Sequence, residues 1–328
     1  MRNIINDFAG KKVLIVGDVM LDAYIIGKVD RVSPEAPVPI VNIGSLENRL
    51  GGAANVALNI AALNAIPVLC SVIGNDKDGL VFLDILKQRG METQNIILSN
   101  DRSTTTKTRV LGNNHHLLRL DKEDLHDLNE MDNNLLLQRY KQVLPNCDVV
   151  ILQDYNKGVL TENNIETLIN LAKKLGKPIA VDPKKKNFLR YKGVTLFKPN
   201  LKEIKEGLNT DANLKDKEQL KKEVLKLNVF LQNELTMVTL SEDGVMISDH
   251  KNFDFIPAHL RNISDVSGAG DTVISVASLC LALGESPKTI AAISNLAGGL
   301  VCEETGVMPI DIEKLNNEFD LIYKNLEY

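Results

Sequence analysis

Short runs of apolar residues alternate with amphipathic segments along almost the whole chain. Six runs rich in Val, Ile and Leu are typical of buried strands: Lys12–Gly17, Ile66–Gly74, Asp148–Gln153, Pro178–Asp182, Val194–Lys198 and Leu235–Leu240. Helical spacing of apolar positions lies between them, at Ala53–Leu63, Asp78–Arg89, Asn133–Val143, Glu162–Leu175 and Glu218–Val229. This alternation predicts an α/β fold with a mainly parallel central sheet, flanked by helices on both faces and built with right-handed crossovers.

Two stretches interrupt that alternation. Ala36–Gly44 and Ser103–Asp121 have the composition of strands, without helices between the strands they contain. The second stretch includes Gly112-Asn-Asn-His-His, which is typical of a hairpin turn. We interpret them as a small β-rich lid, inserted around residues 23–45 and 103–121 into one domain spanning residues 1–328.

Composition narrows the classes of partner. A net charge of -5 and a pI near 5.7 argue against a nucleic-acid partner, because proteins that bind nucleic acids usually have a basic surface. The longest apolar run, Ile274–Leu283, is too short to span a bilayer, and the N-terminal residues do not resemble a signal peptide. The four cysteines are far apart and form no CxxC pair, which predicts reduced thiols and a cytoplasmic protein.

The most informative short stretch is DVSGAGDTVISV, residues Asp265–Val276. Three small residues, Gly268 to Gly270, precede a helix that we expect to begin near Thr272. Unsatisfied N–H groups at a helix start attract anions, and small residues let a phosphate approach them. Asp271 beside such a site could accept the proton of an attacking hydroxyl, but aspartate is also a common N-cap, and the loop alone leaves both readings open. Neither GK[ST] nor GxGxxG is present, which disfavours a P-loop kinase and a simple dehydrogenase.

This stretch resembles the signature of the ribokinase-like (PfkB) sugar kinases, with Ser267 where threonine is usual. Gly51-Gly52 opening a helix, GDVMLD at Gly17–Asp22 and KPNLKE at Lys198–Glu203 match further elements in the family's order. Five segments are also similar to the kinase half of the bifunctional heptose-phosphate kinase/adenylyltransferases of lipopolysaccharide-core synthesis: Arg31–Val41, Thr106–Asp121, Leu152–Leu160, Val181–Lys184 and Val238–Gly244.

The resemblance implies ATP-dependent phosphorylation of D-glycero-β-D-manno-heptose 7-phosphate at its anomeric hydroxyl, giving the 1,7-bisphosphate and ADP. The nearest alternative is a kinase of the same family acting on a ribose or fructose derivative. A sugar-phosphate sensor that has lost catalysis is an answer of a different class, and the intact Asp271 loop counts against it. The chain has no HxGH motif, so we expect a stand-alone kinase without a nucleotidyltransferase domain.

The same resemblance implies roles for individual residues. Asp271 is the expected base, and backbone N–H groups of Gly268, Ala269 and Gly270 form the expected anion hole. The expected ATP and Mg²⁺ region contains Asn200, Leu201, Lys202 and Glu203, with Glu203 as the Mg²⁺ ligand, and Glu242 and Gly244 on the adenine side. The spacing of Asn200 and Glu203 is equally that of a helix capping box, and both readings hold together.

The expected sugar site draws on several segments. The residues expected to contact the substrate are Asp18, Asp22, Gly51, Gly52, Asn55, Asp154 and Lys157, with Arg109, Arg119 and Lys184 as candidate partners of its phosphate. By the same resemblance, a monovalent cation such as K⁺ is expected near Asp265, and lid strands are expected to pair in a homodimer. A lid that closes over the sugar would exclude water from ATP.

Overall fold

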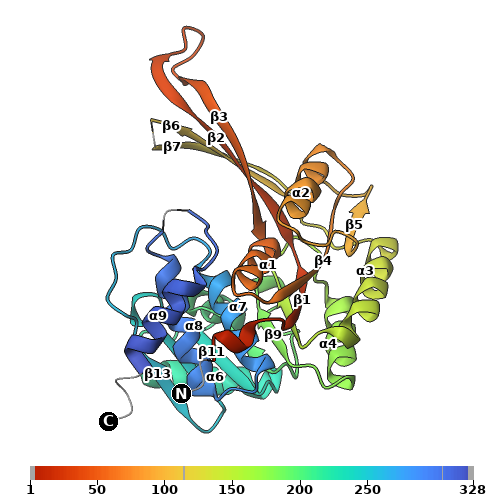
Figure 1. The fold of residues 1–328 in the computed structure, drawn as a ribbon, viewed down its shortest axis with the longest axis vertical. Helices are drawn as coiled ribbons and strands as arrows, with labels where there is room; N and C mark the ends of the chain where they lie inside the picture. Colours follow the sequence, from red (N-terminus) through yellow and green to blue (C-terminus); the bar gives the residue numbers. More distant parts are fainter. Residues whose placement is uncertain (1–3, 114, 305, 324–328) are drawn as a thin grey trace.

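The computed structural model describes residues 4–113, 115–304 and 306–323. Its main element is a nine-stranded sheet with the order β13-β12-β11-β10-β9-β8-β1-β4-β5 (Figure 1). The strands that form it are β1 (Lys12–Gly17), β4 (Ile66–Gly74), β5 (Ile96–Ser99), β8 (Val149–Gln153), β9 (Ile179–Asp182), β10 (Leu196–Phe197), β11 (Leu235–Thr239), β12 (Val245–Ser248) and β13 (Phe253–Ile256). Every pairing from β11 to β5 is parallel, and only β12 and β13 are added antiparallel at one edge.

Helices cover both faces of this sheet. One face carries α1 (Ala53–Ala62), α2 (Lys77–Gln88), α7 (Ala269–Ala282), α8 (Pro287–Val301) and α9 (Ile312–Tyr323), and the other carries α3 (Glu130–Val143), α4 (Glu162–Lys174), α5 (Leu201–Leu208) and α6 (Lys217–Leu231). The central strand β1 contributes to the core on both faces. Val13 and Ile15 pack on the face that carries α1 and α7, while Leu14 and Val16 pack on the face that carries α3 and α4. The continuous apolar sequence of β1 is therefore that of a strand buried on both sides.

A second sheet forms the lid that the sequence predicts. Its four strands, in the order β3-β2-β6-β7, are β2 (Val19–Val32), β3 (Pro39–Gly52), β6 (Thr106–Gly112) and β7 (His115–Lys122). Figure 1 shows the β2–β3 hairpin rising well above the body of the molecule. The lid is larger than expected, because β2 starts directly after β1 and β3 continues to Gly52, where α1 begins. The candidate sugar residues between 18 and 55 therefore lie where lid and body meet.

The predicted α/β fold is confirmed, with specific differences. All six predicted strands form, although β10 contains only Leu196 and Phe197 of the expected Val194–Lys198. The pattern missed β2 and β13, which are partly exposed, and β5 and β12, which are largely buried but only four residues long. Helix α7 begins at Ala269 rather than near Thr272, since Gly268 takes φ = 82° and starts the helix earlier. Among the described residues, no helix combines the length and apolar character needed to cross a membrane.

Candidate active site

Polar side chains gather where neighbouring parallel strands end. Gln153 closes β8, Asp182 closes β9 and Lys198 follows β10 directly, while helix α7 starts beside them. Ligands of open α/β sheets bind at this carboxyl edge. Each of these polar residues is less than a tenth exposed. Burying polar and charged side chains costs free energy of folding, and a role in function would explain why they are buried here.

Asp271 lies at the centre of this edge. It is the third residue of α7, whose N-cap is Gly268, and its side chain makes no capping hydrogen bond. Instead its Oδ2 accepts a hydrogen bond from Asn55 Nδ2 at 2.7 Å, and its Oδ1 accepts one from Tyr155 Oη at 2.7 Å. Gln153 Nε2 also donates to Oδ1 at 3.2 Å. The alternative that Asp271 is only an N-cap is therefore wrong.

The electrostatic setting of Asp271 favours proton exchange near neutral pH. Burial raises the pKa of Asp271 to about 6, although the hydrogen bonds from Asn55 and Tyr155 act in the opposite direction. The nearby Asp182 carboxylate raises this pKa further, and the Lys198 ammonium lowers it. A carboxylate with a pKa in this range is ionised at pH 7 and is basic enough to take a proton from a hydroxyl.

A candidate anion site lies next to Asp271. The first-turn N–H groups of α7 have no acceptor within the helix, and a side chain added at Gly270 would come within 3.8 Å of Lys198 Nζ. Lys198 is 3% exposed and pairs with Asp182 Oδ2 at 2.9 Å. Lys184 adds a second cation, which forms an ion pair with Glu203 and lies 3.9 Å from Asp182 Oδ1. The first turn of α7 thus lies beside the Lys198 ammonium and the Asp182 carboxylate, with Lys184 on the other side of Asp182, and N–H groups next to a cation are an arrangement that can bind a phosphoryl group.

Helix α5 starts with the capping box that its sequence predicts. Asn200 Oδ1 accepts a hydrogen bond from the Glu203 N–H at 2.8 Å, and Glu203 Oε2 accepts one from the Asn200 N–H at 2.9 Å. Leu201 and Lys202 begin the helix, and Lys202 is exposed and pairs with Glu206 along it. A β-bridge from Asn200 to Thr239 brings the end of β11 alongside.

Glu242 and Gly244 follow β11 in the turn before β12. Glu242 is exposed. Gly244 has φ = 91°, and a side chain there would lie 2.1 Å from the Ile256 carbonyl oxygen. The glycine is therefore required by the turn itself, whatever ligand lies nearby.

The fit of Glu203 to Mg²⁺ is limited by its partners. Both carboxylate oxygens are engaged, Oε1 by Lys184 and Oε2 by the Asn200 N–H. Over residues 4–113, 115–304 and 306–323 there is no cluster of three or more His, Cys, Asp or Glu side chains that could hold a metal ion. Mg²⁺ is usually bound by one or two carboxylates together with the phosphates of the nucleotide rather than by a cage of protein groups, so ligation of Mg²⁺ by Glu203 stays a prediction.

The expected sugar residues at the base of the lid lie together. Asp22 on β2 accepts a hydrogen bond from Arg109 Nη1 on β6 at 2.6 Å, and a side chain at Gly51 would come within 2.2 Å of Asp22 Oδ2. Gly52 has φ = 62° at the start of α1. Asn55 Oδ1 is buried and has no hydrogen-bond partner within residues 4–113, 115–304 and 306–323, and a buried acceptor of this kind suits a ligand hydroxyl.

Asp18 and Asp154 point into the protein, contrary to their predicted contact with the sugar. Asp18 is 1% exposed, and its carboxylate accepts hydrogen bonds from three backbone N–H groups, those of Tyr155, Lys157 and Val159. Asp154 is fully buried and accepts hydrogen bonds from Tyr191 Oη, Asn187 Nδ2 and the Asn156 N–H. These acceptor bonds correct the prediction, because they engage both carboxylates in holding the loop after β8.

The other expected cations differ in their surroundings. Lys157 Nζ pairs with Glu123 at 2.6 Å, next to the end of β7. Arg119 faces Arg109 across β6 and β7, but its side chain is 57% exposed and pairs with Asp121 on its own strand. Arg109 is 22% exposed and lies over the ring of Tyr24. Of the two candidate arginines, Arg109 contacts a candidate sugar residue, whereas Arg119 pairs with Asp121.

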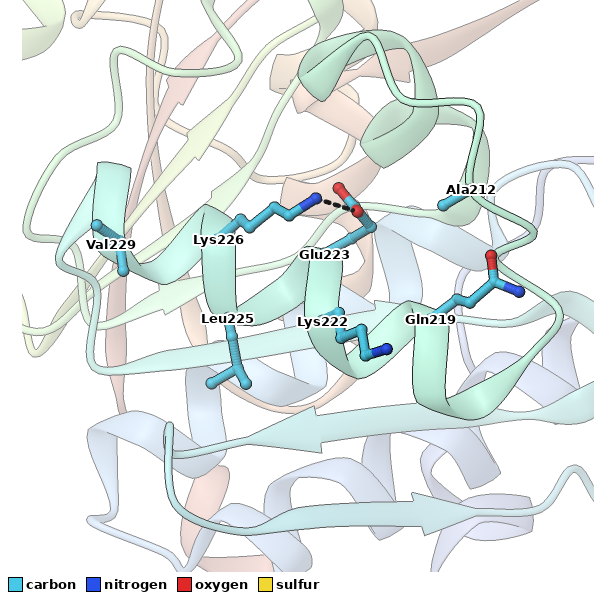
Figure 2. Close-up of a pocket in the computed structure, with 7 residues that line it drawn as sticks. All are labelled: Ala212, Gln219, Lys222, Glu223, Leu225, Lys226 and Val229. Carbon is cyan, nitrogen blue, oxygen red and sulfur yellow. Dashed lines mark hydrogen bonds and ion pairs between the residues drawn. The ribbon is translucent and has the colours of Figure 1, made fainter.

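Four residues of the site had no role assigned from the sequence: Gln153, Tyr155, Asp182 and Lys198. Their shared signal is a polar residue placed at, or just after, the end of a buried parallel strand. That signal is present in the sequence, but it does not distinguish a site residue from a turn residue. The groove along α6 in Figure 2, lined by Ala212, Gln219, Lys222, Glu223, Leu225, Lys226 and Val229, contains none of the candidate site residues.

Comparison with known proteins gives a consistent result. The model of the pfkB family carbohydrate kinases matches residues 10–314. The chain is 39% identical over 309 residues to the bifunctional protein HldE of Desulfatibacillum aliphaticivorans, and 42% identical over 308 residues to that of Chromohalobacter salexigens. These alignments cover 94% and 93% of this chain but 63% and 62% of the relatives, so the chain spans less than two thirds of their length.

Solved structures show the same fold. Phosphofructokinase-2 from Escherichia coli, in its tetrameric inhibited form, superimposes with a TM-score of 0.77 at 17% identity, covering 95% of this chain and 99% of that chain. Arabidopsis thaliana ribokinase complexed with ribose and ATP gives a TM-score of 0.69 at 16% identity, with 94% and 99% covered. At these identities the similarity establishes the fold alone.

Proposed function

The chain belongs to the PfkB family of carbohydrate kinases, and on that premise we propose that it transfers the γ-phosphoryl group of ATP to the anomeric hydroxyl of D-glycero-β-D-manno-heptose 7-phosphate. The products are heptose 1,7-bisphosphate and ADP, on the route to ADP-heptose and the lipopolysaccharide core. Identities of 35–42% to relatives named bifunctional protein HldE, over most of this chain, support this substrate over ribose or a fructose derivative.

The observation that carries the proposal is the carboxylate of Asp271 beside the anion site. The anomeric hydroxyl gives its proton to Asp271 while its oxygen attacks the γ-phosphorus and the bond to ADP breaks. N–H groups at the start of α7, together with Lys198 and Lys184, stabilise the negative charge on the transferring group. MgATP is the co-substrate, and Asn55 and Asp22 are the side chains best placed to accept hydrogen bonds from the sugar.

The heptose assignment predicts a preference for the phosphorylated sugar, with Arg109 as the cation that provides it. Arg109→Ala is expected to lower kcat/KM for heptose 7-phosphate about tenfold more than for unphosphorylated heptose, because a charge-assisted hydrogen bond to the phosphate is lost. Lys184→Ala is expected to lower both values equally, since this cation lies on the side of Glu203 and α5. The measurement is ATP consumption with both heptoses, ribose and fructose 6-phosphate.

Arg119→Ala is the matched control, because Arg119 is an exposed arginine of the same lid. Its kcat/KM should equal that of the wild type for every sugar. If ribose or fructose 6-phosphate is the better substrate, the heptose assignment is wrong. If no sugar is phosphorylated, the protein is a sensor rather than a kinase.

The lid also supports a homodimer. The strand register places Leu46, Ile25, Val110 and Leu118 side by side, and Leu46 and Leu118 are more than half exposed. A row of this kind is costly to leave in water, and we propose that a second copy covers it. Leu46→Glu is expected to convert the dimer to a monomer, measured as molecular mass by sedimentation, and a wild type that sediments as a monomer rules the dimer out.

Two further assignments complete the proposal, a cytoplasmic location and a monovalent-cation site. The four cysteines are free and buried, which fits the reducing cytoplasm. A monovalent cation is proposed beside Asp265, whose carboxylate accepts hydrogen bonds from the N–H groups of Ser267 and Gly306 and so connects the loop before α7 to the segment after α8. A structure of phosphofructokinase-2 in complex with potassium is among the similar structures.

A further inference from the structure

Tyr155 contacts the candidate base although no sequence motif gives it a role. It lies in the loop after β8, and its hydroxyl donates a hydrogen bond to Asp271 Oδ1 at 2.7 Å. Its ring lies 5.6 Å from the ammonium of Lys184, measured to the ring centroid. Tyr155 therefore touches both the base and a cation of the anion site.

The two oxygens of Asp271 are not equivalent. Among the residues that the structure describes, Oδ1 accepts hydrogen bonds from Tyr155 and Gln153, whereas Oδ2 accepts only that of Asn55. Each oxygen of an ionised carboxylate has two acceptor positions. Oδ1 is thus filled by the protein, and Oδ2 keeps one position for a ligand proton.

Two buried carboxylates hold the backbone of the loop that carries Tyr155. The Asp18 carboxylate accepts hydrogen bonds from the backbone N–H groups of Tyr155 at 2.8 Å, Lys157 at 3.1 Å and Val159 at 2.9 Å. Asn156 adopts φ = 55°, and its N–H is held by Asp154 Oδ1 at 2.8 Å. A loop with this many buried hydrogen bonds presents the Tyr155 hydroxyl in one place. This gives a physical reason for the buried Asp18 and Asp154.

We propose that Tyr155 is a positioning residue, whose hydroxyl holds Asp271 ionised and oriented so that Oδ2 accepts the proton of the sugar hydroxyl. This inference rests on the proposed function. The sugar O–H bond breaks as its proton joins Oδ2, the sugar oxygen bonds to the γ-phosphorus, and ADP leaves with the electrons of the broken P–O bond. Asp271 afterwards releases the proton to solvent.

The direction of the expected pH effect follows from the groups around Asp271. Those that face it are Asn55 on α1, Gln153 and Tyr155 from β8 and its loop, Asp182 and Lys184 from β9 and its loop, and Lys198 after β10. Burial raises the pKa of Asp271 to about 6, and the Tyr155 hydroxyl is one of the donors that oppose this rise. Without that hydroxyl the pKa is higher, so the base is lost by protonation at a higher pH.

The test is the pH dependence of kcat/KM for Tyr155→Phe and for the wild type, from about pH 5 to about pH 9. The wild-type rate is expected to fall as the pH drops through about 6, where Asp271 becomes protonated. In Tyr155→Phe this fall should occur about one pH unit higher, with a plateau about tenfold lower.

Tyr140→Phe is the matched control. It also deletes a tyrosine hydroxyl that donates a hydrogen bond, but the acceptor is the Leu168 carbonyl oxygen, at 2.9 Å, and neither residue is part of the site. Its acid limb should coincide with that of the wild type. An acid limb that stays in place in Tyr155→Phe, or moves equally in both variants, overturns the inference.

The profile can be measured with any sugar that the protein phosphorylates, so a wrong substrate leaves the test intact. If no sugar is phosphorylated, the proposed function fails, and the role of Tyr155 is then read from the ¹³C NMR titration of the Asp271 carboxyl, identified by its absence in Asp271→Asn. A titration midpoint unchanged by Tyr155→Phe would overturn the inference in that case.

Discussion

Asp271→Asn is expected to lower kcat by about 10²–10⁴-fold while the fold and ATP binding are retained, because the amide has the size of the carboxylate but cannot accept a proton. Only Asn55, Tyr155 and Gln153 donate hydrogen bonds to the Asp271 carboxylate among the described residues. An asparagine oxygen can keep part of this network. The loss should therefore appear in turnover, measured by ATP consumption, and not in the circular dichroism spectrum or in nucleotide affinity.

Asp216→Asn is the control for a true helix cap. Asp216 is the N-cap of α6 and accepts a hydrogen bond from the Gln219 N–H at 2.9 Å. Asparagine caps helices about as well as aspartate, so this variant should have wild-type turnover. A near-normal kcat in Asp271→Asn would show that its carboxylate is structural and would remove the proposed mechanism.

Lys198→Met is expected to destabilise the protein by about 3–5 kcal/mol at neutral pH, because it leaves the buried Asp182 carboxylate without its closest cation. Lys198 and Asp182 are 3% and 5% exposed, and Lys184 lies 3.9 Å from the other oxygen of Asp182. Urea unfolding followed by circular dichroism gives the change in free energy of unfolding. Turnover should fall as well, because Lys198 lies beside the first turn of α7.

Two further variants separate the effect of Lys198 on stability from its effect on turnover. Lys314→Met removes the lysine of the Lys314–Glu304 pair, in which both side chains are about half exposed, and a pair of this kind contributes little to the free energy of unfolding. Lys198→Met combined with Asp182→Asn should recover much of the stability but not the turnover, since the buried charge is gone while the cation is still missing. If Lys198→Met lowers the free energy of unfolding no more than Lys314→Met does, the buried pair does not stabilise the fold.

The site could be predicted in part from local sequence. The glycine-rich loop before Asp271 and the Asn200–Glu203 spacing were visible as motifs, because a helix start imposes its residue types within a few positions. The motif at Gly17–Asp22 predicts contact with the sugar for both aspartates, although the alternative of a turn or capping role is weaker for Asp22 than for Asp18. The structure gives the two aspartates different partners. Asp22 accepts a hydrogen bond from Arg109 on another strand, and Asp18 accepts one from the backbone of the loop after β8.

Local sequence was enough to predict the class of fold, the β-rich lid and the loop that contains Asp271, because burial on one or both faces sets the pattern of apolar residues that are close along the chain. The surroundings of Asp271 could not be predicted in this way. Asn55 lies 216 positions away from it, Gln153 118 and Tyr155 116. Which polar groups meet depends on how β8, α1 and α7 pack across the sheet, and a pattern of neighbouring residues carries no record of that packing. The same packing sets the burial that raises the pKa of the base.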